Sequence, residues 1–582
     1  MINLSAWDVH PAGYVNNKIL MGGNLNEEKK STQKVTGCTA CSGYGSDGGA
    51  CGSSTSTTSS EPAAESAAST EEAASTDAAA AETEAGTEAA QSDLYGDEVT
   101  INVMVWDRGN AAPGTTTEDN NLTQWIKDQV KELYNINVEY TAVPRSESDD
   151  KVNIMMSGGT APDIIMTYDQ ALFYNYASSG ALKDLTDLYA QYGGDIEANC
   201  TEAEPAGVID GVRYAVMKQR GTEEPRHTAY IRQDWLDQLG MEIPTTKAEL
   251  EEYLYAVKEN NLGGDNTIPW AMSGRTDTEK MYLNFVGSYV TLDSDREAYM
   301  YAESYMAVAP GAEEGLRKLN QWYNDGLISA DFPTDSAEDV YKADIANGNA
   351  GFVLDDVYNP HASFEVLNNT LGTQDVFVPV QCFDLPDGSY RNPFEYRYAM
   401  YVMIPSTTSD EKAAACMKYL NWMADPEVAM NIYYTPDHTM NDLGVAVAPS
   451  TTELQELGYP GTPDDLSIVN QNYTWVNDPD VMAATSYENR TSDWVTEEWY
   501  KNLYEVKEIG KYRFPTYAYI SPDEQTYGTD IKTRMVEFVY NCICCPADQF
   551  DSTYESGYQE LVNAGLQKIL DARGAYYDSV NG

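Results

Sequence analysis

The fold is decided by residues 99–166, which contain VTINVMVW (99–106), NNLTQWIKDQVKEL (120–133), INVEY (136–140), DKVNIMM (150–156) and APDIIM (161–166). The first, third and fifth segments are short and rich in β-branched residues, as is typical of strands. The second places apolar residues on one face of a helix, and the fourth is a helix that ends at Ser157-Gly158-Gly159. A further helix follows around 171–177. Strands alternate with helices, so the sequence predicts an α/β fold with a parallel, doubly wound sheet.

The carboxyl ends of such strands are the expected place for a ligand. Trp106 and Asp107 follow the first strand, and Tyr168 and Asp169 follow the third. We therefore predict that these four residues contact ligand. For Trp106 a core position at the end of the strand is an equal alternative.

A series of short motifs links the chain to a known family. The motifs are Ser157–Ile164 (SGGTAPDI), Gly180–Leu185 (GALKDL), Ile209–Ala215 (IDGVRYA), Tyr230–Gly240 (YIRQDWLDQLG), Trp322–Ile328 (WYNDGLI), Ala346–Phe352 (ANGNAGF) and Pro546–Asp551 (PADQFD). With them the chain resembles, over about residues 98–580, the family 1 extracellular solute-binding proteins of carbohydrate ABC importers, in the lipoprotein branch of Gram-positive bacteria.

This resemblance implies a periplasmic-binding-protein-like fold of type II, in which two α/β lobes are joined by hinge strands and enclose a cleft. The expected solute-binding domain is 98–582. By analogy the first lobe comprises about 98–220 and 405–445, and the second about 225–400 and 450–582. Such proteins close their lobes around a ligand by a hinge motion.

The resemblance also implies a function. We expect a monomeric, non-catalytic receptor that captures an oligosaccharide or related sugar and delivers it to the transmembrane subunits of an ABC permease, without a cofactor. A receptor for a peptide or another non-sugar solute is the nearer alternative, because the same cleft accepts different ligands. A secreted glycoside hydrolase with a pair of carboxylates is the other. The sequence contains no HExxH, GxSxG or GxxxxGK[ST] motif.

Sugar recognition uses aromatic faces, together with carboxylates, amides and arginines that bind hydroxyl groups. Applied to the predicted strand ends, loops and crossings, this rule adds six residues to the four above: Trp270, Arg275, Asp355, Asp356, Tyr396 and Arg397. Arg275 has a surface salt bridge as its alternative, and the Asp355-Asp356 pair has a helix N-cap. An acidic chain rich in Tyr and Trp favours a neutral sugar.

The composition excludes other classes of function. The chain has 92 acidic and 36 basic residues, so its formal charge is −56. Nucleic-acid binding and docking on anionic lipid both need a basic surface, which this charge denies. No run of 18 apolar residues occurs, so no transmembrane helix is expected.

Residues 1–97 differ in amino-acid composition from the rest of the chain. Residues 52–97 form a Ser/Thr/Ala/Glu tract that predicts a disordered acidic spacer. Before it, Cys51 resembles the lipidated cysteine of a bacterial lipoprotein, with Cys38 as an alternative, which implies a lipid anchor on the extracellular face of the cell membrane. Residues 1–51 are otherwise atypical, because 1–34 lack the apolar region of an export signal. We expect a wrong reading frame or start site upstream of Cys51; a soluble protein with a polar tail is the alternative.

Two stretches contain residue types that bind metals, but neither has the full set of ligands that a metal site needs. Cys542, Cys544 and Cys545 cluster near the C-terminus, but no second pair of zinc ligands accompanies them. The stretch 384–389 (DLPDGS) contains calcium-type oxygen ligands, yet a hairpin turn explains Asp-Gly better. We therefore predict no metal site.

Overall fold

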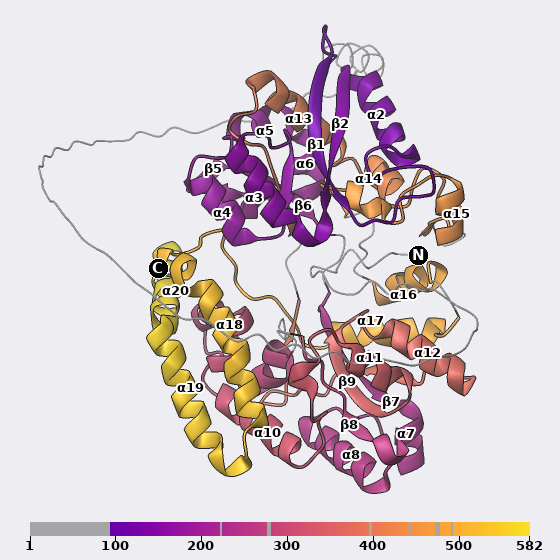
Figure 1. Cartoon of the computed structure of the whole chain (residues 1–582), viewed down its shortest axis with the longest axis vertical. Coiled ribbons are helices and arrows are strands. Elements are labelled where there is room, and N and C mark those ends of the chain that lie inside the picture. The colour runs from indigo at the N-terminus through magenta and orange to yellow at the C-terminus, as the bar shows by residue number, and fades with distance from the viewer. Residues whose placement is uncertain are drawn as a thin grey trace, which may run out of the picture. The chain divides into compact units, whose positions relative to one another are not determined.

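The computed structural model describes residues 94–582, apart from 221–223, 276–280, 395–397, 442–443, 472–477 and 491–492 (Figure 1). These residues belong to one compact unit of the chain. The described apolar side chains form separate large cores, one in the first of two α/β lobes and two in the second, and the two-lobed fold is the one expected from the sequence. None of the helices that the structure describes combines the length and the apolar composition needed to cross a bilayer.

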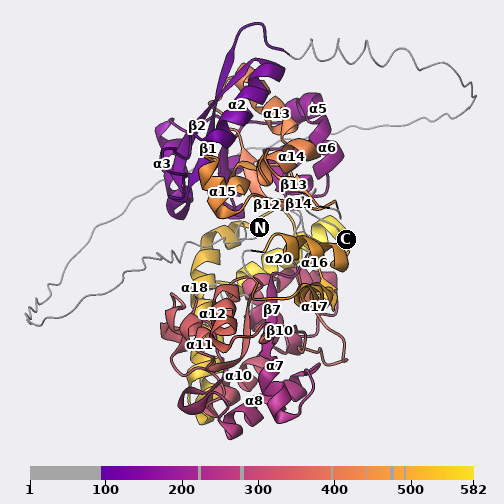
Figure 2. The same cartoon turned by 90° about the vertical axis from the view of Figure 1, so that its right-hand side faces the viewer.

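The first lobe contains most of the elements before residue 220 and a second group after residue 398 (Figure 2). Its strands are β1 (Val99–Asp107), β2 (Ile136–Pro144), β3 (Ile165–Thr167), β4 (Val208–Ile209), β5 (Val212–Arg213), β6 (Ala215–Gln219), β12 (Tyr398–Met403), β13 (Thr439–Met440) and β14 (Ala446–Val447). Its helices are α2 (Asn121–Tyr134), α3 (Ser148–Gly158), α4 (Gln170–Ser178), α5 (Thr186–Tyr192), α6 (Gly194–Cys200), α13 (Asp410–Trp422), α14 (Pro426–Tyr433) and α15 (Thr451–Glu456).

The sheet of the first lobe corrects the prediction of a purely parallel sheet. Strand β1 pairs in parallel with β2, and a parallel bridge between Val103 and Ile164 connects β1 to the start of β3. Strand β12 then lies between β3 and β6 and is antiparallel to both. It runs the other way because it brings the chain back from the second lobe. The carboxyl ends of β1, β2, β3 and β6 therefore share one edge of the sheet, and the chain leaves for the second lobe at that edge.

The second lobe is built around another mixed sheet, in the order β10-β7-β9-β8. Its strands are β7 (His227–Arg232), β8 (Ile268–Trp270), β9 (Ala350–Asp356), β10 (Phe377–Val380), β11 (Asn392–Pro393) and β15 (Lys511–Tyr512). Its helices are α7 (Gln233–Leu239), α8 (Lys247–Asn260), α9 (Asp295–Met300), α10 (Ala312–Asn324), α11 (Asp339–Ala346), α12 (His361–Leu371), α16 (Pro479–Glu488), α17 (Glu497–Glu508), α18 (Pro522–Cys544), α19 (Phe550–Ala564) and α20 (Leu566–Asn581). Helices α18 to α20 pack together and against α9 and α10 (Figure 1).

Core membership places one lobe boundary differently from the sequence analysis. Leu454, Leu466 and Val469 belong to the core of the first lobe, whereas Met482 and the residues after it pack in the second. The chain thus crosses for the last time after Val469, and not near residue 450. The reason is that α15 and the turn after it fold back onto the first lobe and bury their apolar residues there.

Local caps and turns shape both lobes. Thr246 caps α8 through a reciprocal capping box with Glu249, and Gly240 ends α7 with a positive φ of 66°. The turn between β4 and β5 is Asp210-Gly211, with φ angles of 51° and 82°. These residues shape the lobes and do not reach the strand-end edge.

Candidate functional site

The shared strand edge of the first lobe carries an aromatic stack. The rings of Trp106, at the end of β1, and Tyr168, just after β3, lie 5.1 Å apart with an angle of 15° between their planes. Trp106 is only 3% exposed and belongs to the core of the first lobe, which is the alternative position considered for it, whereas Tyr168 is half-buried. The guanidinium carbon of Arg145, the residue after β2, lies 4.4 Å from the Trp106 ring centroid and 4.9 Å from that of Tyr168. Burial raises the pKa of Tyr168 to about 12, so its hydroxyl keeps its proton and remains a donor.

Two polar groups of this stack lack partners in the part of the chain that the structure describes. The indole nitrogen of Trp106 is buried without a hydrogen bond, as is Nε of Arg145. Arg145 also forms no ion pair with a described carboxylate. A buried donor without an acceptor costs free energy, so a ligand that supplies acceptors would recover it.

A group of charged residues continues the site on the same edge. Arg108 forms two hydrogen bonds with the Asp465 carboxylate: its Nε donates to Oδ2 at 2.6 Å, and its Nη2 donates to Oδ1 at 2.9 Å. Lys218, on β6, is buried, and its Nζ donates to the backbone carbonyl of Asp464 at 3.4 Å. Gln219 is fully buried, and neither atom of its side-chain amide has a described partner.

Asp464 is the least satisfied of these groups. Its side chain is 2% exposed, and neither carboxylate oxygen accepts a hydrogen bond from another described residue. Burial, and next the Asp465 carboxylate, raises the pKa of Asp464 to about 7, while burial lowers the pKa of Lys218 to about 8. Perturbed groups gathered with unpartnered polar atoms at one strand edge are typical of a binding site. We refer to Trp106, Arg108, Arg145, Tyr168, Lys218, Gln219, Asp464 and Asp465 as the strand-end site.

In the second lobe, charged residues gather where β9 ends and β7 begins. Asp356 pairs with Nε of Arg226 at 3.3 Å and with Nε2 of His227 at 3.1 Å, and Arg275 lies 3.9 Å from it. Asp355 is fully buried and accepts a hydrogen bond from Nδ2 of Asn359 at 2.8 Å. The predicted residues Arg275 and Asp356 are thus brought together in an ion network. Asp355 instead accepts a hydrogen bond from the segment that follows β9.

Other predicted residues have structural roles or lie outside the described residues. Trp270 is 1% exposed and packs against Phe285, Trp322 and Phe352, so it is a core residue and not a ligand contact. Asp169 caps α4 and Asp107 accepts hydrogen bonds from its own loop. Tyr396, Arg397, Cys38 and Cys51 fall outside the described residues.

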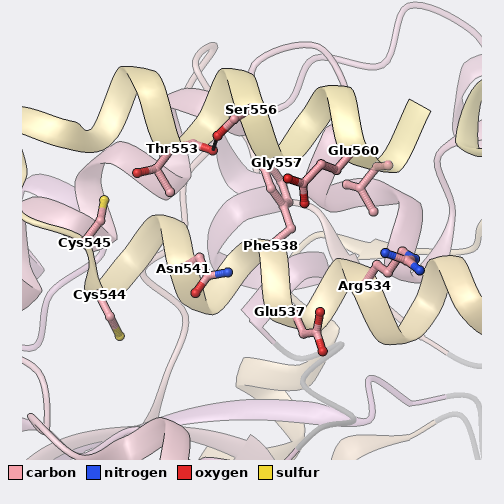
Figure 3. A pocket seen from close by; sticks show the side chains of 11 residues that line it. Arg534, Glu537, Phe538, Asn541, Cys544, Cys545, Thr553, Ser556, Gly557 and Glu560 are labelled. Atoms are coloured by element: carbon pink, nitrogen blue, oxygen red, sulfur yellow. Dashed lines mark hydrogen bonds between the residues drawn. The ribbon is translucent and has the colours of Figure 1, made fainter. Parts of the chain in front are cut away.

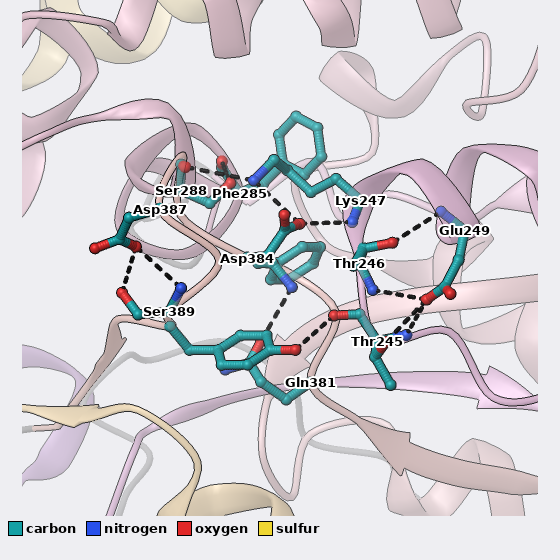
Figure 4. Close-up of polar contacts among 12 residues, drawn as sticks. Thr245, Thr246, Lys247, Glu249, Phe285, Ser288, Gln381, Asp384, Asp387 and Ser389 are labelled. Carbon is teal, nitrogen blue, oxygen red and sulfur yellow. Dashed lines mark hydrogen bonds and ion pairs between the residues drawn. The ribbon is translucent and has the colours of Figure 1, made fainter.

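The two features considered for metal binding also have structural explanations. Among the described residues, no three His, Cys, Asp or Glu side chains converge as a metal ion would require. Stretch 384–389 is the predicted hairpin turn: Gly388 has a φ of 83°, and Asp387 accepts from the backbone and hydroxyl of Ser389, while Asp384 accepts from the backbone of Lys247 (Figure 4). Cys542, Cys544 and Cys545 are free thiols.

A hollow elsewhere lies within a single lobe. A groove of about 400 Å³ runs between α18 and α19, with Arg534, Glu537 and Glu560 along it and Phe538 packed against Gly557 (Figure 3). Its lining residues all come from these helices and the loop after α18, so closure of the two lobes would not enclose a ligand there. The strand-end site is therefore the better candidate.

The fold and the site define a class: two α/β lobes, linked by repeated crossings of the chain, with a binding edge where the strands of the first lobe end. A model of the family described as bacterial extracellular solute-binding protein matches residues 113–430, more than half of the chain, and the chain belongs to that family. The family and the similar structures are binding proteins rather than enzymes.

Two curated relatives come from Bacillus subtilis (strain 168). The polygalacturonan/rhamnogalacturonan-binding protein YtcQ is 23% identical over 261 residues, which cover 42% of this chain and 51% of YtcQ. Lipoprotein LipO is 23% identical over 314 residues, which cover 50% of this chain and 58% of LipO. The chain thus spans about half the length of the curated relatives it matches.

Solved structures share the fold at low sequence identity. An extracellular solute-binding protein from Bifidobacterium longum subsp. infantis has a TM-score of 0.61 at 16% identity and covers 84% of this chain and 100% of its own. The alginate-binding protein AlgQ2 has a TM-score of 0.57 at 18% identity, with 83% and 99% covered. These similarities confirm the type II periplasmic-binding-protein-like fold that the motifs imply.

Proposed function

We propose that this protein is the receptor of an ABC importer and binds an oligosaccharide or related sugar at the strand-end site. The observation that carries the proposal is the stack of Trp106, Tyr168 and Arg145 beside buried polar groups without partners. Aromatic rings pack against the apolar faces of sugar rings, and the half-buried ring of Tyr168, supported from below by Trp106, offers such a face. The unpartnered donors and acceptors suit a ligand with many hydroxyl groups. Family membership supports the role of solute receptor.

The charges at the strand-end site favour an acidic sugar, contrary to the neutral one expected from composition. Arg108 is neutralised by Asp465, but Arg145 and Lys218 form no ion pair with a described carboxylate. The Asp464 and Asp465 carboxylates attract Lys218, and the Asp149 carboxylate attracts Arg145, but none of these carboxylates lies within ion-pair distance of either cation. A negatively charged ligand group would therefore find two cations without a close ion pair. The name of YtcQ makes uronate-containing oligosaccharides the first ligands to test.

The proposal also includes closure of the two lobes, their boundaries and the location of the protein at the membrane. Each lobe would hold one wall of the site, and closure about the crossing segments would present the closed form to the permease. We place the first lobe at about 98–220 and 398–470 and assign the rest of 98–582 to the second. A lipid on Cys51, or on Cys38, would hold the receptor at the extracellular face of the membrane, as a monomer on the spacer 52–97.

A thermal-shift screen of the full chain tests the proposal. The panel contains oligogalacturonates, neutral oligosaccharides and short peptides, and product analysis runs alongside. A saturable rise in melting temperature with an oligosaccharide, without turnover, is the expected result. A shift with peptides alone would replace the sugar with a peptide ligand, and cleavage of a glycan would show that the protein is a glycoside hydrolase.

A further inference from the structure

A second cavity lies between the two lobes, apart from the strand-end site. It has a volume of about 300 Å³ and opens between the β4–β5 turn of the first lobe and the segment that leads into α18. Its walls include Asp210 from that turn, Tyr517 and Tyr519 from the segment, and Tyr576 from α20. No residue of the strand-end site lines it.

Tyrosine rings make up much of the wall. The rings of Tyr519 and Tyr576 stack at 4.2 Å with an angle of 13°, and Tyr174, on α4, meets Tyr519 edge-on at 6.1 Å. Tyr517 meets Tyr576 edge-on at 5.4 Å. The half-buried rings of Tyr517, Tyr519 and Tyr576 line the cavity, whereas Tyr174 packs against Tyr519 from outside the lining.

The hydroxyl groups of these rings are largely unused. Those of Tyr174, Tyr519 and Tyr576 form no hydrogen bond with another described residue, whereas that of Tyr517 accepts from Nδ2 of Asn581 at 2.7 Å. Burial, followed by the Tyr519 hydroxyl and the Asp210 carboxylate, raises the pKa of Tyr174. Burial also raises the pKa of Tyr576, with Tyr517 and Asp210 contributing next. The hydroxyls of Tyr174 and Tyr576 therefore keep their protons, and the Asp210 carboxylate lies close enough to act on both.

We propose that this cavity is a second carbohydrate site that takes one neutral hexopyranose ring. The volume fits a single ring, the phenyl faces suit its apolar face, and the hydroxyls of Tyr519 and Tyr576 with the Asp210 carboxylate match its hydroxyl groups. The lining carries two carboxylates, Asp210 and Glu202, against one cation, Arg513, and this balance disfavours an anionic sugar. The two sites thus differ in the charge of the sugar that they accept.

The cavity is physically connected to the strand-end site. Gln170 lies two residues after Tyr168 and donates from Nε2 to the carbonyl of Tyr517 at 2.8 Å. Because its walls come from both lobes, a sugar in the cavity would contact both and would favour the arrangement in which the walls face each other.

The test uses the full chain and saturation-transfer NMR with the methyl glycosides of glucose, galactose and mannose, and with methyl galacturonide as the acidic probe. We expect transfer to at least one neutral glycoside, weaker transfer to the acidic one, and about tenfold weaker neutral binding in Tyr519→Ala. Tyr577→Ala is the matched control: Tyr577 is on the same helix and packs 6.2 Å from Tyr517, but does not line the cavity. It should bind as the unmodified protein does.

A variant of the strand-end site separates this proposal from the proposed function. In Trp106→Ala the neutral glycosides should still bind. If they are lost in Trp106→Ala and retained in Tyr519→Ala, they occupy the strand-end site and the second site does not exist. The absence of transfer to every neutral glycoside would also overturn it. Should Tyr519→Ala fail to fold, Tyr519→Phe removes the hydroxyl alone, and unchanged binding in that variant would count against the donor role.

Discussion

Replacing Arg145 with alanine should weaken ligand binding more than it lowers the unfolding free energy of the protein. Its guanidinium lies over two aromatic rings but forms no ion pair with a described carboxylate, so the substitution leaves no buried charge unpaired. The loss of two cation–π contacts costs about 1–2 kcal/mol of unfolding free energy. A hydrogen bond to a charged ligand group is worth about 1.5–3 kcal/mol. The dissociation constant for an oligogalacturonate should therefore rise by about 10- to 150-fold.

Titration calorimetry with the tightest oligogalacturonate of the screen measures this change, and urea unfolding measures the stability of each variant. Arg145→Lys keeps the charge and loses the planar fork, so its dissociation constant should fall between those of the unmodified protein and Arg145→Ala. Lys151→Ala is the control for charge alone: Lys151 lies on α3 in the same lobe, is 46% exposed and pairs with Glu147. A dissociation constant for Arg145→Ala within twofold of the unmodified value, in a folded protein, would refute the role given to Arg145.

Three further predictions follow from the strand-end site. Trp106→Ala should weaken sugar binding by about 1–3 kcal/mol in calorimetry, because Tyr168 and Arg145 lose the ring against which they pack; unchanged affinity in a folded variant would remove Trp106 from the site. Because burial raises the pKa of Asp464 to about 7, the folded protein holds a proton that the unfolded chain releases near pH 4. The unfolding free energy of the unmodified protein should thus fall, relative to Asp464→Asn, as the pH rises from about 4 to 7, and a constant difference would contradict this pKa. Asp465→Ala leaves the Arg108 guanidinium without its partner and should cost about 3 kcal/mol in urea unfolding. Asp493→Ala breaks the exposed pair with Arg490 and should cost under about 1 kcal/mol, so equal losses would show that burial does not matter here.

The fold was predictable because its signals are local. Periodicity located β1, α2 and α3. The direction of β12 was not predictable from such signals, because a strand of six residues reads the same in either direction. Its neighbours are decided by pairing with strands about 180 residues or more away in the sequence.

The site was only partly predictable, for the same reason. Trp106 and Tyr168 follow strands that the sequence marks clearly, and they do stack. Arg145 was missed because β2 was ended at residue 140, whereas it continues to Pro144 and places Arg145 at its carboxyl end. Asp465 was missed because its partner Arg108 is 357 residues away. For Trp270, an apolar strand alone could not tell a core tryptophan from one that faces a ligand.

The position of β12 has a consequence for the order in which the lobes can be completed. The sheet of the second lobe is drawn from one continuous stretch, 227–380, whereas the sheet of the first lobe lacks its middle strand until residues 398–403 have emerged. A chain that emerges from its N-terminus therefore exposes β3 and β6 with unpaired edges while the later lobe is already able to pair all its strands. We expect the sheet of the second lobe to pair its strands before that of the first, whereas the helices that complete the second lobe's cores, α16 to α20, emerge last.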